Sequence, residues 1–200
     1  MPSLKAILSI CLLAIFILAS PKNASAAEPF KDMSIFISNF TEVGLADFKA
    51  KDILNPAAPG EMLRFGIYHN FINNFKTRIK KCTDKKCPQG SFKVEGKFVA
   101  ESLKKYFDYT LNHAELNLAG TPYTYDGTFY HFKGMTDDPK EYAEVTKAQK
   151  TADKIQMSGR IYFQYDPHKT NATFKAIARP HTFQGKKNFA ILAITTGSNP

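Results

Sequence analysis

The segment from Lys154 to Tyr165, in which apolar and polar side chains alternate, constrains the fold more than any other feature of this chain. This period of two is typical of a half-buried β-strand, because successive side chains of a strand point to opposite faces of the sheet. The flanking segments also have strand character, so the last quarter of the chain predicts an antiparallel sheet. We expect its strands at 142–150, 154–165, 170–179 and 188–196, with turns at 151–153, 166–169 and 180–187, the last turn being the longest.

Three amphipathic segments are expected to form helices that cover this sheet: 30–43, 61–76 and 97–111. Each carries apolar residues three and four positions apart, which places them on one face of a helix. The second segment is apolar over one broad side and polar over the other. Its polar side is either a solvated surface or the lining of a polar site, and it comprises Gly66, His69, Asn70, Asn73 and Lys76.

The segment 122–132 predicts a β-hairpin, since Asp126-Gly127 lies between alternating aromatic residues and favours a type I′ turn. A two-residue loop would place Tyr125 opposite Thr128 and Tyr123 opposite Tyr130. A short strand is expected nearby at 91–94. The aromatic face of the hairpin would either stabilise the sheet or stack on a ligand, and it comprises Tyr123, Tyr125, Tyr130 and Phe132.

The first 26 residues resemble a secretory signal peptide rather than part of the fold. Lys5 precedes an apolar run at 6–19, and the small residues at 24–26 suit a signal peptidase site. The run is short for a membrane span, although an uncleaved anchor is the alternative. We therefore expect an exported protein, periplasmic or secreted, with one α+β domain at 27–200 and no membrane span after cleavage.

Basic residues outnumber acidic ones in the expected mature chain. Without Lys5 and Lys22 the protein keeps 25 of its 27 basic residues against 18 acidic ones, a net charge of about +7. In an exported protein this charge favours contact with an anionic envelope surface, or serves solubility, and nucleic acid is not an expected partner.

The expected mature chain contains two cysteines, Cys82 and Cys87, within the basic stretch 78–86 and just after it. An even pair in an exported protein predicts a disulfide. Two cysteines are too few ligands for a structural zinc site, and no histidine is near them in sequence, so we expect no metal and no cofactor; free thiols or a bound metal are the alternative to the disulfide. The basic stretch is either a rigid contact for an anionic partner or a solvated loop tip.

The sequence contains no catalytic motif that would identify an enzyme. It lacks a Gly-x-Ser-x-Gly elbow, a phosphate-binding glycine loop and a His-Glu-x-x-His motif. Acid–base catalysis by one histidine beside a carboxylate stays open, because such partners meet only in the fold. The five histidines show no metal-ligand spacing: His69, His113, His131, His168 and His181.

The order of helices and strands resembles the cystatin-like and NTF2-like α+β folds, in which a curved sheet wraps a helix and leaves a cone-shaped cavity. The matching parts are the helix at 97–111 and the strands between 142 and 196. The cystatin inhibitory loops are absent, so the resemblance implies a fold and no activity. The chain also resembles small exported bacterial proteins. We expect N-terminal helices packed on a curved antiparallel sheet of four to six strands.

These observations favour an exported binding or interaction protein for an unknown small molecule or envelope partner. The alternatives are a small hydrolase or isomerase with its site between sheet and helices, and a structural envelope protein that acts through its basic surface. If a site exists, we expect large polar side chains from otherwise apolar elements to line it: His69, Tyr123, Tyr125, Arg160, Tyr162 and Arg179.

The last expected strand is apolar on both faces between Phe189 and Ile194, so both faces should be covered. Ala190, Leu192 and Ile194, extended by Ile177, would form the second apolar face. Its cover would be the helix at 30–43 or, alternatively, a second copy of the chain in a symmetric homodimer.

Overall fold

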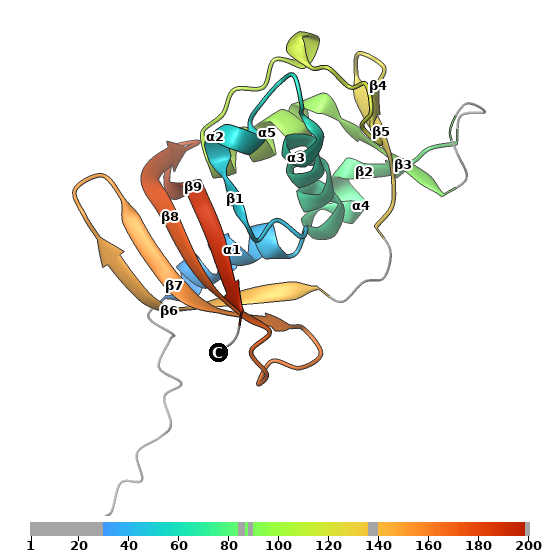
Figure 1. The fold of residues 1–200 in the computed structure, drawn as a ribbon. Helices are drawn as coiled ribbons and strands as arrows, with labels where there is room; N and C mark the ends of the chain where they lie inside the picture. The colour runs from blue at the N-terminus through green and yellow to red at the C-terminus, as the bar shows by residue number, and fades with distance from the viewer. Residues whose placement is uncertain (1–29, 84–86, 88–89, 136–139, 199–200) are drawn as a thin grey trace, which may run out of the picture.

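Two antiparallel β-sheets, with helices packed between them, make up the α+β fold (Figure 1). The computed structural model describes residues 30–83, 87, 90–135 and 140–198, so the expected signal peptide lies outside the described residues. The helices are α1 (Lys31–Thr41), α2 (Ala50–Ile53), α3 (Gly60–Asn73), α4 (Phe75–Arg78), α5 (Gly96–Phe107) and the 3-10 turn η1 (His113–Glu115). None of those described is long and apolar enough to span a membrane.

The larger sheet has five strands in the order β1-β9-β8-β7-β6. Its strands are β1 (Phe48–Lys49), β6 (Glu141–Lys150), β7 (Ile155–Phe163), β8 (Ala172–Phe183) and β9 (Lys186–Ser198). The alternation that predicted β7 is confirmed at Ile155, Met157 and Ile161, which are buried on the helix-facing side. The strand ends at Phe163 instead of Tyr165, which is 70% exposed, because the chain turns at Asp166.

The connection between β8 and β9 is a tight turn, so the expectation of a long loop at 180–187 is wrong. Phe183 pairs with Lys186, and the two residues between them, Gln184 and Gly185, have φ angles of 50° and 75°. Two positive φ angles in succession match the twist of the flanking strands. Pro180 did not end the strand, because β8 pairs with β9 alone beyond Ala178.

A β-bulge explains why β9 is apolar at consecutive positions. Ile177 pairs with Ala193 and Ala178 pairs with Ile191, so Leu192 is an extra residue without a partner in β8. The bulge changes which alternate positions face the helices, and both Ile191 and Ile194 are therefore buried on the inner face. The expected second apolar face, with Ile194 on it, is wrong; the homodimer stays a prediction.

Helix α1 lies along the outer edge of β6, and the expectation that it covers the outer face of β9 is wrong (Figure 1). Three hydroxyls on one side of the helix bond to the backbone of β6. The Ser38 hydroxyl accepts from the Ala143 N–H at 2.9 Å and donates to the Ala143 carbonyl at 3.3 Å. Ser34 accepts from the Val145 N–H at 2.9 Å, and Thr41 donates to the Glu141 carbonyl at 2.7 Å.

The helix expected at 61–76 is interrupted at Asn74 and continues as α4, while α5 ends at Phe107 because Asp108 adopts a left-handed φ of 55°. α3 is buried on several sides, since it packs against α5 as well as the second sheet. A Cβ added at Gly66 would lie 2.7 Å from the Val99 side chain, so glycine permits the close approach of α5. The solvated polar side predicted for this helix is wrong for His69 and Asn70, which are buried.

The smaller sheet has four strands in the order β2-β3-β5-β4. Its strands are β2 (Ile79–Lys81), β3 (Ser91–Glu95), β4 (Thr124–Tyr125) and β5 (Phe129–Lys133). Tyr125 pairs with Tyr130, so the predicted two-residue hairpin loop is wrong. The Asp126 carboxylate accepts from the Thr128 and Phe129 N–H groups at 2.9 and 2.7 Å and stabilises a longer turn. A register shift of two residues preserves the faces, and the predicted aromatic face is buried at Tyr123, Tyr130 and Phe132.

Candidate functional site

The six side chains expected to line one site lie in separate parts of the molecule. Arg160 and Tyr162 are on the outer face of the larger sheet, where Arg160 pairs with Glu144 at 2.6 Å. Tyr123 is buried beside Tyr68 under the smaller sheet. Tyr125 stacks on His113 with 5.0 Å between ring centroids. Among the described parts of the chain, these four residues are not brought together in one cavity.

His69 is part of the packing between α3 and α5. Its ring stacks on Phe65 at 5.4 Å and meets Tyr106 edge-on at 4.7 Å. Its Nδ1 lies 3.2 Å from the Asn73 amide nitrogen. Burial, reinforced by the charges of Lys105 and Arg78, lowers the pKa of His69 to about 3, so the ring is neutral near pH 7. The geometry indicates a structural histidine.

Arg179, the sixth predicted residue, lines a cleft of about 1140 Å³. The cleft lies between the start of α1, the end of α5 and the end of the β8–β9 hairpin. Its walls combine apolar residues with lysines, an arginine and a histidine. The lining residues include Phe30, Lys31, Asp32, Met33, Ile35, Phe36, Asn39, Lys105, Tyr106, Lys150, Ile155, Arg179, Pro180, His181, Thr182, Lys187, Asn188 and Phe189.

Cationic groups outnumber carboxylates around this cleft. Lys31, Lys150 and Lys187 form no ion pair with any residue that the structure describes, and Asp32 is the one acidic lining residue found there. Arg179 pairs with Asp108 at 2.5 Å, just outside the cleft wall. The cleft therefore favours a negatively charged occupant.

His181 points its polar ring into the protein, with 7% of its side chain exposed. Its Nδ1 lies 3.6 Å from the Asp108 carboxylate, and its Nε2 is buried without a hydrogen-bond partner among the described residues. Hydrogen bonds from Lys104 and Arg179 lower the pKa of Asp108 to about 2, so this carboxylate is ionised at neutral pH. A buried nitrogen without a protein partner is uncommon, and His181 is therefore a notable polar group of this cleft.

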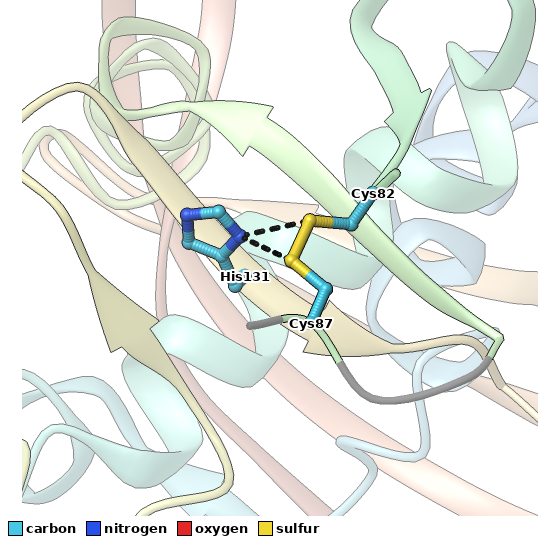
Figure 2. Close-up of side chains that lie close together, drawn as sticks. All are labelled: Cys82, Cys87 and His131. Atoms are coloured by element: carbon cyan, nitrogen blue, oxygen red, sulfur yellow. Dashed lines mark hydrogen bonds between the residues drawn. A yellow bond between two sulfur atoms is a disulfide. The ribbon is translucent and has the colours of Figure 1, made fainter. Parts of the chain in front are cut away.

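A second polar cluster lies on the smaller sheet, where the predicted Cys82–Cys87 disulfide is confirmed (Figure 2). Cys82 follows β2, Cys87 lies in the connection to β3, and His131 is on β5. The His131 Nδ1 lies 3.4 Å from the Cys82 sulfur and 3.6 Å from the Cys87 sulfur. Three groups that bind metals or exchange protons therefore converge on one point.

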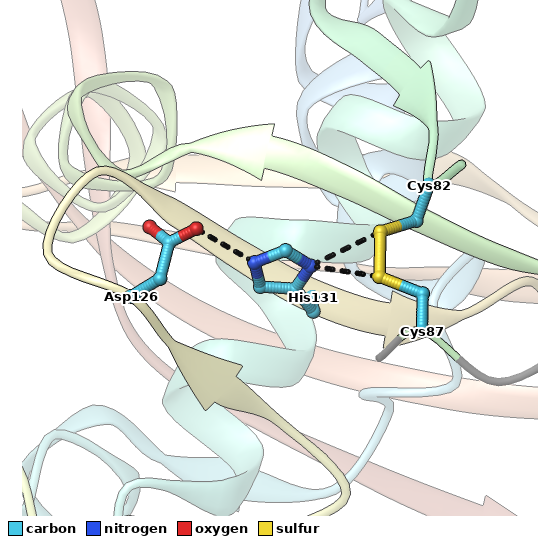
Figure 3. Close-up of a disulfide and its surroundings, with 4 residues drawn as sticks. All are labelled: Cys82, Cys87, Asp126 and His131. Atoms are coloured by element: carbon cyan, nitrogen blue, oxygen red, sulfur yellow. Dashed lines mark hydrogen bonds and ion pairs between the residues drawn. A yellow bond between two sulfur atoms is a disulfide. The ribbon is translucent and has the colours of Figure 1, made fainter. Parts of the chain in front are cut away.

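The Asp126 carboxylate orients the His131 ring from its other side (Figure 3). The distance from His131 Nε2 to Asp126 Oδ2 is 2.8 Å. The backbone N–H of Phe129, His131 and the N–H of Thr128 lower the pKa of Asp126 to about 2, so its carboxylate is an acceptor at neutral pH. Nε2 therefore donates a hydrogen bond to Asp126, and Nδ1 is the nitrogen that faces the two sulfurs.

Sequence reasoning missed this cluster because His131 is 49 residues from Cys82 and 44 from Cys87. Only the pairing of Lys93 with His131, between two strands that the sequence predicts separately, brings them together. Asp126-Gly127 predicted a turn, and nothing in the sequence indicated that the Asp126 carboxylate would also contact His131. The His181–Asp108 pair was missed for the same reason, because the two residues belong to elements far apart in the chain.

Comparisons with known proteins add no assignment to this geometry. The chain matches no protein-family model, and neither the curated proteins nor the solved structures include a significant match. The function is therefore inferred from the chemistry of the residues in the cleft and in the disulfide cluster.

Proposed function

We propose that this protein is an exported binding protein whose cleft holds an anionic ligand with an apolar part. The observation that carries the proposal is the cleft of about 1140 Å³, whose lining combines apolar side chains with lysines that form no ion pair among the described residues. A concave, mostly apolar site with a few convergent polar groups is the usual form of a small-molecule site. Export rests on the signal peptide expected at residues 1–26.

The lining of the cleft supports a ligand with two chemically distinct ends. Phe30, Ile35 and Phe189 offer apolar surface, and the Phe189 ring lies 5.5 Å from the buried ring of Phe36. Lys150 and Lys187 supply positive charge close to this surface. A long-chain carboxylate or an alkyl phosphate would place its chain on the rings and its head group among the lysines.

The cystatin-like or NTF2-like layout is retained as part of this proposal. Its support is a five-stranded antiparallel sheet with α5 packed against β9 on the inner side. In such folds a cavity between sheet and helix serves binding, and the cleft proposed here adjoins α5 at Lys105 and Tyr106.

Calorimetric titration of the mature protein tests the proposal with three probes below their micelle concentrations: dodecyl phosphate, inorganic phosphate and dodecyl maltoside. We expect saturable binding of dodecyl phosphate alone. The double variant Lys150→Glu/Lys187→Glu should weaken it by about tenfold or more, or about 1.4 kcal/mol. Its control is Lys147→Glu/Lys175→Glu, which makes the same charge change on the exposed outer face of the sheet. Equal losses in the two variants, or equal binding of the maltoside, would contradict the proposal.

A hydrolase or isomerase is the second candidate, favoured by the His181–Asp108 pair. Binding ranks first because the His181 Nε2 that would act as a base is buried. Turnover of p-nitrophenyl dodecanoate that is lost in His181→Asn would reverse this order.

A further inference from the structure

We propose that Cys82, Cys87 and His131 form a redox-gated site for a thiolate-preferring metal ion such as zinc. When the disulfide is intact, the sulfurs are poor ligands and the site is closed. Reduction frees two thiols beside an imidazole nitrogen that already points at them (Figure 2). The cluster lies on the smaller sheet, so the proposal is independent of the cleft and of its ligand.

The geometry of the closed state is close to that of a zinc site. Zinc–sulfur and zinc–nitrogen bonds of about 2.3 and 2.05 Å at a tetrahedral angle separate sulfur from nitrogen by about 3.6 Å. The observed distances from His131 Nδ1 to the two sulfurs are 3.4 and 3.6 Å. Only the two sulfurs must separate, from a bond length of about 2.05 Å to about 3.8 Å across a tetrahedral metal.

Asp126 completes the arrangement as a partner of the histidine ligand (Figure 3). A histidine that binds a metal through one nitrogen commonly donates its other N–H to a carboxylate, which fixes the ring and increases its basicity. The 2.8 Å contact between His131 Nε2 and Asp126 provides this support before any metal binds. Three protein ligands then leave a fourth position for water or another donor.

The two cysteines are attached to the sheet in different ways. Cys82 is held by the hydrogen bond from its N–H to the Ser91 carbonyl at 2.9 Å. Cys87 lies five residues further on, in the connection between β2 and β3 and outside both strands. Both cysteines are partly exposed, so a reductant can reach the bond.

The switching step needs a reductant, which we assign to the class of dithiol proteins. Two thiols of the reductant exchange with the Cys82–Cys87 bond, so the reductant becomes a disulfide and the protein gains two thiols. Two electrons and two protons pass to the protein in this step. Zinc then displaces the two thiol protons as it binds both sulfurs and His131.

Metal titration of the mature protein tests the site in both redox states. Cobalt(II) reports tetrahedral thiolate ligation by its visible and near-ultraviolet absorption, and zinc affinity follows from competition with a chromophoric chelator. After reduction with a phosphine, which is oxidised to its oxide, we expect one equivalent of cobalt to bind. The oxidised protein should bind none.

Two variants and one control separate a built site from a pair of free thiols. His131→Ala should lower the zinc affinity of the reduced protein by at least about tenfold, and Asp126→Asn by about 10–100-fold. The Asp126→Asn side chain keeps an oxygen that can accept the two turn N–H groups, and circular dichroism verifies folding. His168→Ala changes an exposed histidine in the β7–β8 turn and should leave the affinity unchanged. The proposal is overturned if reduced protein binds no cobalt, or if His131→Ala binds zinc as the native chain does.

Discussion

The edge strands β6 and β2 are held by different contacts. A helix lies along β6 and satisfies its backbone through the Ser34, Ser38 and Thr41 hydroxyls. Beyond β2 the chain instead forms a small covalent loop, Cys82–Cys87, against His131. Exposed strand edges promote pairing with other chains, and the helix protects the β6 edge from such contacts.

The difference between the two edges lies in their coupling to the core. The helix at β6 also carries Phe36 and Phe40, which are 4% and 0% exposed and belong to the main core. Cys82 and Cys87 are only partly buried, and neither belongs to that core. The helix at β6 is therefore built into the core, whereas the two cysteines lie outside it.

The largest effect should come from detaching the helix at β6. Phe40→Ala removes a ring that contacts Phe65 at 4.8 Å and Phe107 at 5.5 Å, and should lower the free energy of unfolding by about 3–5 kcal/mol. Urea denaturation measures the change. Phe75→Ala, which truncates a ring that is 40% exposed, is the control and should have a much smaller effect. Similar losses in both variants would contradict the coupling of this edge to the core.

Removing a hydroxyl that bonds to β6 should lower the free energy of unfolding by less than removing the Phe40 ring. Ser38→Ala leaves the N–H and the carbonyl of Ala143 without their side-chain partner, and we expect a loss of about 2–3 kcal/mol in the free energy of unfolding. Ser158→Ala, on the outer face of β7, is the matched control. A change within measurement error for Ser38→Ala would mean that water replaces the hydroxyl, and the edge would then be held by packing alone.

The pH dependence of stability probes the helix layer beside this edge. His69 has a pKa of about 3 in the folded protein against an ordinary value of 6.5, so below pH 6.5 the unfolded chain binds a proton that the folded one does not. Stability should therefore fall between pH 7 and pH 5, with about 2 kcal/mol from this residue. Denaturation of His69→Gln at both pH values should show a correspondingly smaller difference. An unchanged difference would show that His69 is not the group responsible.

The smallest effect should come from opening the loop at β2. Cys82→Ser/Cys87→Ser should lower the free energy of unfolding by no more than about 2 kcal/mol, because the disulfide closes a short loop. Hydrogen exchange should increase in β2 and β3 and remain the same in β6 to β9. Faster exchange throughout the larger sheet would contradict the view that the disulfide is separate from the core to which the helix at β6 belongs.

Much of the fold could be predicted from local patterns. The alternation at Ile155, Met157 and Ile161 located β7. The turn of the hairpin was predicted wrongly, but its aromatic face was predicted correctly, because a register shift of two residues keeps each side chain on the same face. Leu192 shows the limit of such patterns. Its bulge depends on how β9 pairs with β8, and a run of apolar residues does not reveal where one residue is left out of the pairing.

The candidate sites depended on contacts that spacing does not encode. His69 was predicted to line a site because it lies among polar residues on a helix, yet α3 is buried from several sides and the ring packs on Phe65. Arg179 lies in the cleft, but His181 beside it was identified only by its distance to Asp108. The cysteines predicted a disulfide, while their histidine comes from a strand more than 40 residues away.

The helix along β6 also bears on the order in which the chain can assemble. Ser38 and the residue that it bonds, Ala143, are separated by 105 positions, so a chain that emerges N-terminus first exposes α1 long before its strand exists. Contacts of such long range form slowly, because the intervening loop must first be closed. Until β6 has formed, α1 with Phe36 and Phe40 cannot dock, and until α1 docks, the β6 edge can pair with other chains. A nascent molecule therefore passes through an aggregation-sensitive interval, which ends only when its first helix docks on its second half.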